Sequence, residues 1–282
     1  MEIKRVGVVG CGLMGGGIAQ VCAEAGYETV AREINDDLLN KGLNAIQTNW
    51  KKAVARGKMT EDEQAAALNR LKGTTSMKDF ENCDLVIEAV IELMDLKKEV
   101  FSELDSIVPE HGILATNTSC LSIIEMASAT KRPDKVMGIH FFNPVPVMKL
   151  VEVVETISTS PESMEIGRKF SESLKKQVVH AKDSPGFIVN LLLIPFLLDA
   201  IRAYEKGLAS KEDIDTGVKL GLNHPMGPLA LTDLVGLDTT YHIACAMFEE
   251  TKDPKYASPV LLKQMVTAGW MGRKSGKGFY DY

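Results

Sequence analysis

The sequence predicts an α/β fold with a doubly wound, mainly parallel sheet and a helical-hairpin insertion, followed by an all-helical C-terminal domain. Short apolar segments alternate with helical patterns as far as residue 181, an order that gives parallel strands with helices packed on the sheet. A long, charged, helical segment at residues 35–72 interrupts that order. After Ser184-Pro185-Gly186 the strand signals nearly vanish, so we expect one domain at residues 1–184 and a second at residues 185–282.

The first elements are expected to form a strand–helix–strand unit. Residues 3–9 (IKRVGVV) are a short apolar run typical of a buried strand. A helix is expected at 13–26, ending at Gly26, a residue type common at helix C-termini. ETVARE at 28–33 is the next strand, and a short crossover of this kind joins parallel strands. Within the helical segment 35–72, Gly57 marks a break, and TEDE at 60–63 begins the second helix with a capping box.

Strands and helices continue to alternate beyond the hairpin. CDLVIEAV at 83–90 is expected to be the third strand of the chain. The remaining expected strands are GILAT with its exit loop NTS (112–119), KVMGIHFF (135–142), LVEVVE (150–155) and QVVHA (177–181), and helices are expected at 94–108 and 161–175. Residues 187–282 are expected to be all-helical, with proline and glycine interruptions at 221–228.

The composition is that of a globular protein. Apolar residues make up 45% of the 282 residues and charged residues 25%. The formal net charge of −6 does not favour nucleic acid, whose binders are usually basic. Five scattered cysteines without CxxC spacing predict neither a metal site nor disulfides, and they favour a reducing compartment. We see no signal peptide, and the longest apolar run, 188–198, is too short to span a bilayer. We therefore expect no membrane association and a cytoplasmic location.

GCGLMG at residues 10–15 fits the G-x-G-x-x-G pattern of dinucleotide-binding proteins. It follows an expected strand, opens an expected helix, and Glu33 stands at the end of the next strand, as the Rossmann-type fingerprint requires. Gly10 permits the tight turn, Gly12 lets the backbone approach the pyrophosphate, and Gly15 allows close helix–strand packing. The alternative is a glycine turn that binds no nucleotide. A carboxylate at position 33 favours NAD over NADP, although the neighbouring Arg32 leaves NADP open.

Polar residues follow the strand that ends near residue 116. Asn117, Thr118 and Ser119 are expected at the carboxyl edge of the sheet, where ligands bind in doubly wound folds. They can hydrogen-bond the oxygen of a substrate. The alternative is local, because Ser119 or Ser122 can serve as the N-cap of a helix at LSIIEMA.

His140 also lies at the carboxyl end of an expected strand. A single histidine there is more often structural than catalytic, but Glu152 in the next apolar strand is costly to bury unless it is paired. His140 is the obvious partner, and such a pair would orient the imidazole for acid–base chemistry.

The chain resembles the short-chain L-3-hydroxyacyl-CoA dehydrogenase family, and in particular its bacterial members that act on 3-hydroxybutyryl-CoA. The resemblance is carried by VGVVGCGLMGGGIAQ, NTSCLSI, GIHFFNPVPVMKLVEVV, DSPGFIVN, NHPMGPL and GRKSGKGFYDY, which extend from residue 6 to the C-terminus. It implies interconversion of (S)-3-hydroxybutyryl-CoA and acetoacetyl-CoA by hydride transfer with NAD(H) or NADP(H), and a homodimer formed through the C-terminal domain. Plain monomer core is the alternative role for the apolar helices of that domain.

The resemblance also implies roles for individual residues. His140 and Glu152 match the catalytic dyad, and Ser119 and Asn190 match residues that bind the substrate at the reaction centre. Positions that surround the dinucleotide are Gly10, Gly12, Leu13, Met14, Gly15, Glu33, Glu92, Lys97, Asn117, Asn143 and Lys274. Lys52 and Arg56 of the hairpin match positions that meet coenzyme A.

Several of these assignments have plain alternatives. Lys52 and Arg56 fit a solvated helix face nearly as well, and Asn190 fits a buried amide bonded to backbone. The sequence departs from the family pattern at four positions. These are Glu33, where aspartate is commoner, Cys120, where serine is usual, Leu191, where a basic residue is usual, and Leu198, where a polar residue is commoner. A dehydrogenase for a 3-hydroxy acid without coenzyme A, and a nucleotide-binding structural protein, are the competing functions.

Overall fold

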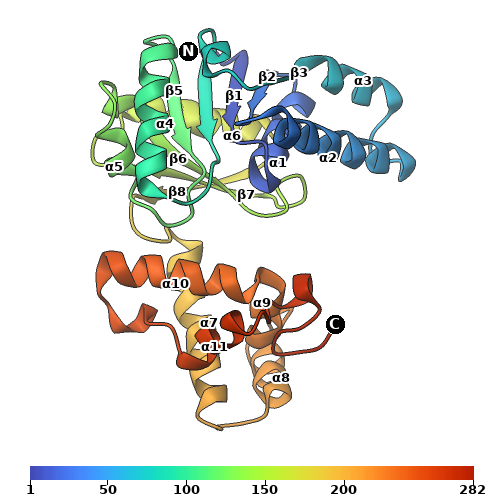
Figure 1. Cartoon of the computed structure of the whole chain (residues 1–282), viewed down its shortest axis with the longest axis vertical. Helices are drawn as coiled ribbons and strands as arrows, with labels where there is room; N and C mark the ends of the chain where they lie inside the picture. The colour runs from blue at the N-terminus through green and yellow to red at the C-terminus, as the bar shows by residue number, and fades with distance from the viewer. The chain divides into compact units, whose positions relative to one another are not determined.

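The computed structural model describes residues 1–282 and divides into two compact units, Met1–Asp183 and Ser184–Tyr282. Each unit is described separately below, and Figure 1 shows the course of the chain through both. None of the helices combines the length and the apolar character needed to cross a bilayer.

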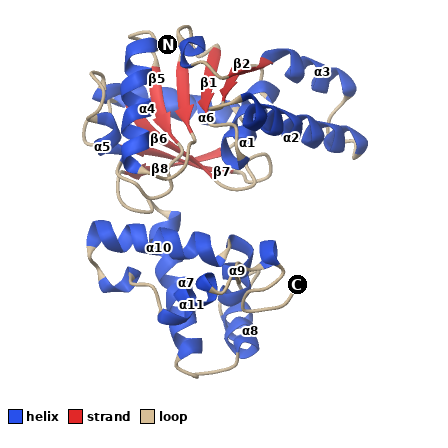
Figure 2. Cartoon of the chain, viewed as in Figure 1, coloured by secondary structure: helices blue, strands red, loops and turns tan.

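The first unit is built on one eight-stranded sheet (Figure 2). Its strands are β1 Arg5–Val9, β2 Glu28–Arg32, β3 Leu71–Thr74, β4 Leu85–Glu88, β5 Ile113–Thr116, β6 Val136–Phe141, β7 Leu150–Glu155 and β8 Gln177–Lys182. They lie in the order β3-β2-β1-β4-β5-β6-β7-β8, and every neighbouring pair is parallel except β6–β7, which is antiparallel. The predicted doubly wound, mainly parallel sheet is confirmed.

Helices cover this sheet because its central strands are apolar on both faces. Every residue of β4 and β5 is buried, as expected for strands inside a parallel sheet. The helices of the unit are α1 Leu13–Glu24, α2 Asp36–Ala55, α3 Glu61–Arg70, α4 Met94–Ile107, α5 Ile123–Ala127 and α6 Pro161–Ser173, with short 3-10 turns η1 Met77–Phe80 and η2 Pro133–Lys135.

The predicted helical hairpin is formed by α2 and α3. Thr60 and Glu63 make the expected capping box at the start of α3. The hairpin is fastened to α1 by a hydrogen bond of 2.7 Å from the Trp50 indole nitrogen to the carboxylate of Glu24, and Trp50 itself is fully buried. The buried Trp50 and its hydrogen bond thus hold α2 against α1.

The prediction that helix continues to residue 72 is wrong. Residues Leu71–Thr74 form β3, which pairs in parallel with β2 at the edge of the sheet. As a result, the segment predicted as the third strand is the fourth, β4. LKGT is a four-residue edge strand with Lys72 and Gly73 exposed, so it lacks the apolar run that identifies buried strands.

The second unit is helical, as predicted. It contains α7 Val189–Glu205, α8 Lys211–Gly221, α9 Pro228–Val235, α10 Leu237–Thr251 and α11 Val260–Thr267, with 3-10 turns η3 Pro254–Tyr256 and η4 Arg273–Ser275. Two buried carboxylates hold its irregular parts in place. Asp215 accepts the amides of Leu229 and Ala230 at the start of α9, and Asp233 accepts the amides of Phe279 and Tyr280 in the C-terminal segment.

Candidate active site

The carboxyl edge of the sheet carries the glycine loop between β1 and α1. The neighbouring strands β1 and β4 form the topological switch point, where doubly wound folds bind nucleotides. Gly10 has a φ of +96°, and a Cβ at Gly15 would lie 1.8 Å from the Gly10 carbonyl oxygen, so both positions require glycine. A Cβ at Gly12 would meet nothing within 4 Å, and α1 begins there without a side-chain cap. The loop therefore leaves open backbone and unpaired helix N–H groups for a pyrophosphate.

Glu33 lies directly beside this loop. One carboxylate oxygen accepts the amide of Cys11 at 2.7 Å, and the other accepts the amide of Ile34 at 3.1 Å. Burial, together with the negative charge of Glu33, raises the pKa of the Cys11 thiol to about 11. The Cys11 thiol is therefore protonated at neutral pH, and its role is packing. The Glu33 carboxylate lies at the end of β2, where the fingerprint predicts it.

His140 and Glu152 come together on the antiparallel β6–β7 pair. They are register partners, and His140 Nδ1 lies 2.6 Å from a Glu152 carboxylate oxygen. His140 is 5% exposed and Glu152 is fully buried. The Phe142 ring packs on the imidazole, with ring centroids 4.6 Å apart. The predicted contact between histidine and glutamate is present, and it lies at the same edge of the sheet as the glycine loop.

The turn between β6 and β7 is hydrogen-bonded to the side chain of Lys176, which precedes β8. Its ammonium donates to the carbonyl oxygens of Val145 at 2.6 Å and Met148 at 2.8 Å. Burial lowers the pKa of Lys176. Val145 is itself buried in the core of the unit. Asn143 lies within this turn, whose path is therefore determined by packing and by a lysine from the segment before β8.

The loop after β5 is tied to its neighbours on both sides. The side-chain oxygen of Asn117 accepts the amide of Phe141 at the end of β6, at 2.9 Å. The amide of Ser119 donates to Glu92 at 3.0 Å. Ser122 occupies the N-cap position of α5, but its side chain makes no capping hydrogen bond. The carboxylate of Asp183 instead accepts the amides of Ile123 at 3.2 Å and Ile124 at 2.8 Å. The alternative interpretation is therefore correct for the position of Ser122 and wrong for Ser119, and neither hydroxyl caps the helix.

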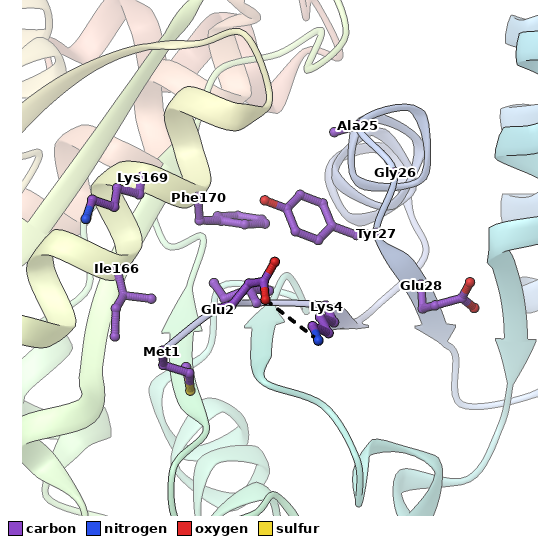
Figure 3. A pocket seen from close by; sticks show the side chains of 11 residues that line it. Met1, Glu2, Lys4, Ala25, Gly26, Tyr27, Glu28, Ile166, Lys169 and Phe170 are labelled. Carbon is purple, nitrogen blue, oxygen red and sulfur yellow. Dashed lines mark ion pairs between the residues drawn. The ribbon is translucent and has the colours of Figure 1, made fainter.

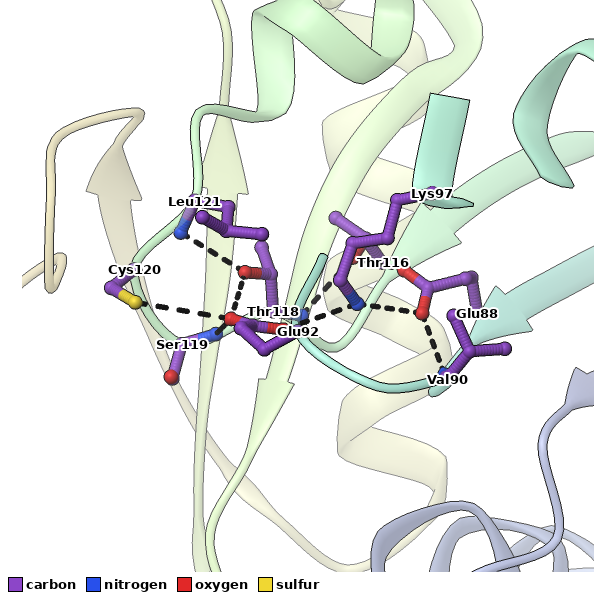
Figure 4. A network of polar contacts seen from close by, with 9 residues as sticks. All are labelled: Glu88, Val90, Glu92, Lys97, Thr116, Thr118, Ser119, Cys120 and Leu121. Carbon is purple, nitrogen blue, oxygen red and sulfur yellow. Dashed lines mark hydrogen bonds and ion pairs between the residues drawn. The ribbon is translucent and has the colours of Figure 1, made fainter. Parts of the chain in front are cut away.

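Lys97 is enclosed by two carboxylates at the same edge (Figure 4). Its ammonium lies 2.7 Å from Glu88 and 3.1 Å from Glu92, and Lys97 is only 1% exposed. Thr116 donates its hydroxyl to Glu88 at 2.7 Å, and Thr118 donates to Glu92. Burial raises the pKa of Glu92, but the charge of Lys97 and the hydrogen bonds from Thr118 and Ser119 outweigh it, so the pKa falls below its ordinary value.

The remaining predicted residues lie elsewhere in the chain. Lys52 and Arg56 are exposed at the end of α2. Asn190 lies in the first turn of α7 in the second unit and is 8% exposed. Lys274, also in the second unit, has its ammonium 2.6 Å from the carboxylate of Asp238. Apart from Lys52 and Arg56, the predicted residues of the first unit lie at the carboxyl edge of the sheet or in the loops that follow its strands.

A separate hollow of about 640 Å³ lies at the opposite edge of that sheet (Figure 3). It is bordered by Lys4 and Glu28, which stand at the N-terminal ends of β1 and β2, and by the rings of Tyr27 and Phe170, whose planes are tilted by 52°. Because ligands of doubly wound folds bind at the carboxyl ends of the strands, this hollow is not the candidate active site.

The sheet and its glycine loop define a dinucleotide-binding protein, and comparison with known proteins gives the family and its oxidoreductase class. The family model described as "3-hydroxyacyl-CoA dehydrogenase, NAD binding domain" matches residues 5–184. The model described as "3-hydroxyacyl-CoA dehydrogenase, C-terminal domain" matches residues 186–282. The chain belongs to the 3-hydroxyacyl-CoA dehydrogenase family. Its first domain is the NAD-binding domain of that family, so its cofactor is NAD(H).

Individual relatives agree with this assignment over at least 91% of their length. The chain is 51% identical to a 3-hydroxybutyryl-CoA dehydrogenase of Mycobacterium tuberculosis in an alignment 282 positions long that covers 99% of each chain. It is 45% identical to the human mitochondrial hydroxyacyl-coenzyme A dehydrogenase over 288 aligned residues, covering 99% of this chain and 91% of the human protein. The crystal structure of (S)-3-hydroxybutyryl-CoA dehydrogenase from Ralstonia eutropha superimposes with a TM-score of 0.95 at 44% identity, covering 100% of this chain and 99% of the other.

Proposed function

We propose that this enzyme interconverts (S)-3-hydroxybutyryl-CoA and acetoacetyl-CoA with NAD(H), using His140 as the general acid–base group and Glu152 to orient it. The observation that carries the proposal is the 2.6 Å contact between His140 Nδ1 and the Glu152 carboxylate, at the edge of the sheet that also carries the glycine loop. The names of the relatives from M. tuberculosis and R. eutropha support the choice of substrate.

Oxidation of a secondary alcohol requires removal of a hydride from carbon and a proton from oxygen. Bound NAD⁺ supplies the hydride acceptor. Because Glu152 holds Nδ1, proton exchange with the substrate oxygen is assigned to Nε2 of His140. In the oxidative direction the imidazole takes the proton, and the adjacent carboxylate stabilises the resulting cation. In the reductive direction the same nitrogen returns the proton to the new alkoxide.

The chain offers further groups for binding. Ser119 and Asn190 are proposed to position the substrate oxygens at the reaction centre. Lys52 and Arg56, both exposed on α2, are proposed to meet the phosphates of coenzyme A. The glycine loop with Leu13 and Met14, together with Glu33, Glu92, Lys97, Asn117, Asn143 and Lys274, is proposed to surround the dinucleotide.

The second unit is proposed to form a homodimer. Leu192, Leu208 and Leu220 are 69%, 77% and 74% exposed in the single chain. The family resemblance supports this proposal, and these leucines supply apolar surface that a dimer interface would bury. Light scattering of the purified chain tests the assignment, and a monomeric mass across the micromolar range would reject it.

The substrate assignment is tested by following NADH absorbance with acetoacetyl-CoA, then with NADPH in place of NADH, and then with free acetoacetate. We expect turnover with acetoacetyl-CoA and NADH and very weak activity with the free acid. Equal activity on free acetoacetate would favour a dehydrogenase for acids without coenzyme A. If neither NADH nor NADPH supports turnover, the enzyme proposal is rejected, and the alternative of a nucleotide-binding structural protein is favoured.

A further inference from the structure

The cluster formed by Glu88, Glu92 and Lys97, called here the carboxylate–lysine cluster, lies next to the topological switch point. Glu88 is the last residue of β4, and β4 pairs with β1, the strand that leads into the glycine loop. Glu92 lies in the loop that follows β4. The cluster is therefore part of the carboxyl edge at which the dinucleotide binds.

The hydrogen-bond directions determine the charge of Glu88. The Thr116 hydroxyl accepts the amide of Thr118 at 3.1 Å, so its own proton points to Glu88. Glu88 also accepts the amide of Val90 and the ammonium of Lys97, each at 2.7 Å. A carboxyl group that only accepts hydrogen bonds, from three donors, is an ionised carboxylate.

The same pattern is repeated at Glu92. The Thr118 hydroxyl accepts the amide of Leu121 at 3.1 Å and donates to Glu92, which also accepts the Ser119 amide at 3.0 Å. Glu92 is likewise an ionised carboxylate, in agreement with its lowered pKa. Two carboxylates thus share the single ammonium of Lys97. The cluster carries one uncompensated negative charge, shared between Glu88, which is 0% exposed, and Glu92, which is 37% exposed.

A doubly wound sheet binds one mononucleotide on each half. Glu33, beside the end of β2, marks the half that holds the adenosine ribose, so the nicotinamide half is assigned to the side of β4 and β5. This step rests on the dinucleotide position proposed above. The two cofactor forms differ in the nicotinamide ring, which is positively charged in NAD⁺ and neutral in NADH.

We propose that the excess negative charge of the carboxylate–lysine cluster raises the affinity of the site for NAD⁺ relative to NADH, and that Glu88 is a specificity-determining residue for the oxidation state of the cofactor. A negative charge in a poorly solvated position is weakly screened, so it stabilises a nearby cation more than a neutral ring. Glu88 acts on the cofactor through space and does not need to touch it.

The test compares the dissociation constants of NAD⁺ and NADH, measured by calorimetry for NAD⁺ and by fluorescence for NADH. Contacts that both forms make cancel in the ratio of the two constants. Glu88→Gln and Glu92→Gln each remove one negative charge, so the ratio Kd(NAD⁺)/Kd(NADH) should rise by at least about threefold. Lys97→Met removes the positive charge, and the ratio should fall. Opposite shifts for the two charge types distinguish an electrostatic effect from general damage to the site.

Glu125→Gln is the matched control. Glu125 pairs with Lys98, the next residue of α4, at 2.8 Å, but neither partner is buried, whereas the cluster contains the buried Glu88 and Lys97. Its loss should leave the ratio unchanged. Circular dichroism and thermal unfolding verify each variant. If a substitution at buried Glu88 or Lys97 prevents folding, Glu92→Gln carries the test, because the Glu92 side chain is 37% exposed.

A ratio that stays within about twofold of the wild type in every folded cluster variant would overturn the inference. A shift of the same sign in Glu92→Gln and Lys97→Met would also overturn it. If the wild type turns over acetoacetyl-CoA with NADH while the ratio does not respond, the inference fails and the proposed function stands. If the wild type binds neither nucleotide, both proposals fail together.

Discussion

Glu152 lies directly opposite His140 on the neighbouring antiparallel strand, and its carboxylate is fully buried 2.6 Å from the imidazole. A buried carboxylate is unfavourable unless hydrogen bonds or an opposite charge compensate for its lost hydration. The imidazole provides that compensation, and in return the carboxylate determines the ring orientation and the tautomer. The contact can therefore serve to stabilise the buried carboxylate, to orient the imidazole for acid–base chemistry, or both. Substitutions at His140 and Glu152 distinguish these roles.

Replacement of His140 by alanine should remove the group that exchanges the proton. We expect kcat with acetoacetyl-CoA and NADH to fall by about a hundredfold to ten thousandfold, while the dissociation constant of NADH changes little. His180→Ala is a matched control, because His180 also faces a glutamate, Glu155, at 3.3 Å, but on the exposed part of β8. A kcat for His140→Ala similar to that of the control would show that the dyad assignment is wrong.

Replacement of Glu152 by glutamine keeps the size of the side chain and an oxygen that can accept from Nδ1. It removes the negative charge that stabilises a protonated imidazole. We therefore expect a loss of about tenfold to a hundredfold in kcat, smaller than that of His140→Ala, and a changed pH profile of kcat. Glu155→Gln on the same strand should leave both unaffected. An unchanged pH profile for Glu152→Gln would argue that Glu152 only packs.

The fold class was predictable because strand and helix periodicities alternate clearly and the helical domain lacks strand signals. The edge strand at Leu71–Thr74 was missed because it is short and half exposed. His140 and Glu152 were predictable because a carboxylate inside an apolar strand requires a partner. The same signal is present in LVIE at Glu88, but the residue stands at the strand end, where its burial is not evident from the pattern.

Other residues of the site could not be predicted from local sequence. Asp183 accepts backbone amides 59 and 60 positions away, and Lys176 donates to carbonyl oxygens 28 and 31 positions away. Their partners are main-chain atoms, which leave no trace in the side-chain pattern. Only the packed arrangement of β6, β7 and α5 brings these groups within reach.

Glu33 should control the choice between NAD and NADP. Its carboxylate lies beside the glycine loop and would repel a 2′-phosphate. We expect Glu33→Ala to lower the preference for NAD by about tenfold, equivalent to about 1.4 kcal/mol, as measured from kcat/KM with each cofactor. Glu28→Ala, at the opposite end of β2, is the control. An unchanged preference in Glu33→Ala would contradict its assignment to the adenosine ribose.

The lowered pKa of Glu92 makes a prediction about stability and pH. The carboxyl group has an ordinary pKa of 4.5, and its folded-state pKa lies below this value. A depressed pKa contributes stability above the unfolded-state pKa, and that contribution is lost as the pH falls through the folded-state pKa. Glu92→Gln should therefore cost about 1 kcal/mol or less at neutral pH, and the difference from the wild type should shrink below pH 4.5. Urea unfolding over this range measures it, and a difference that grows on acidification would disprove the assignment.

Lys176 should stabilise the turn that joins the two strands of the His140–Glu152 pair. Lys176→Met removes two charge-assisted hydrogen bonds to the carbonyl oxygens of Val145 and Met148 and leaves those acceptors partly buried. We expect a loss of about 2 kcal/mol in the free energy of unfolding. We also expect a lower kcat, because the turn carries Asn143. Lys175→Met is the control, because it makes the same substitution at the exposed neighbouring position and should leave stability and kcat unchanged. If both variants unfold at the same urea concentration and turn over equally fast, the turn does not depend on Lys176.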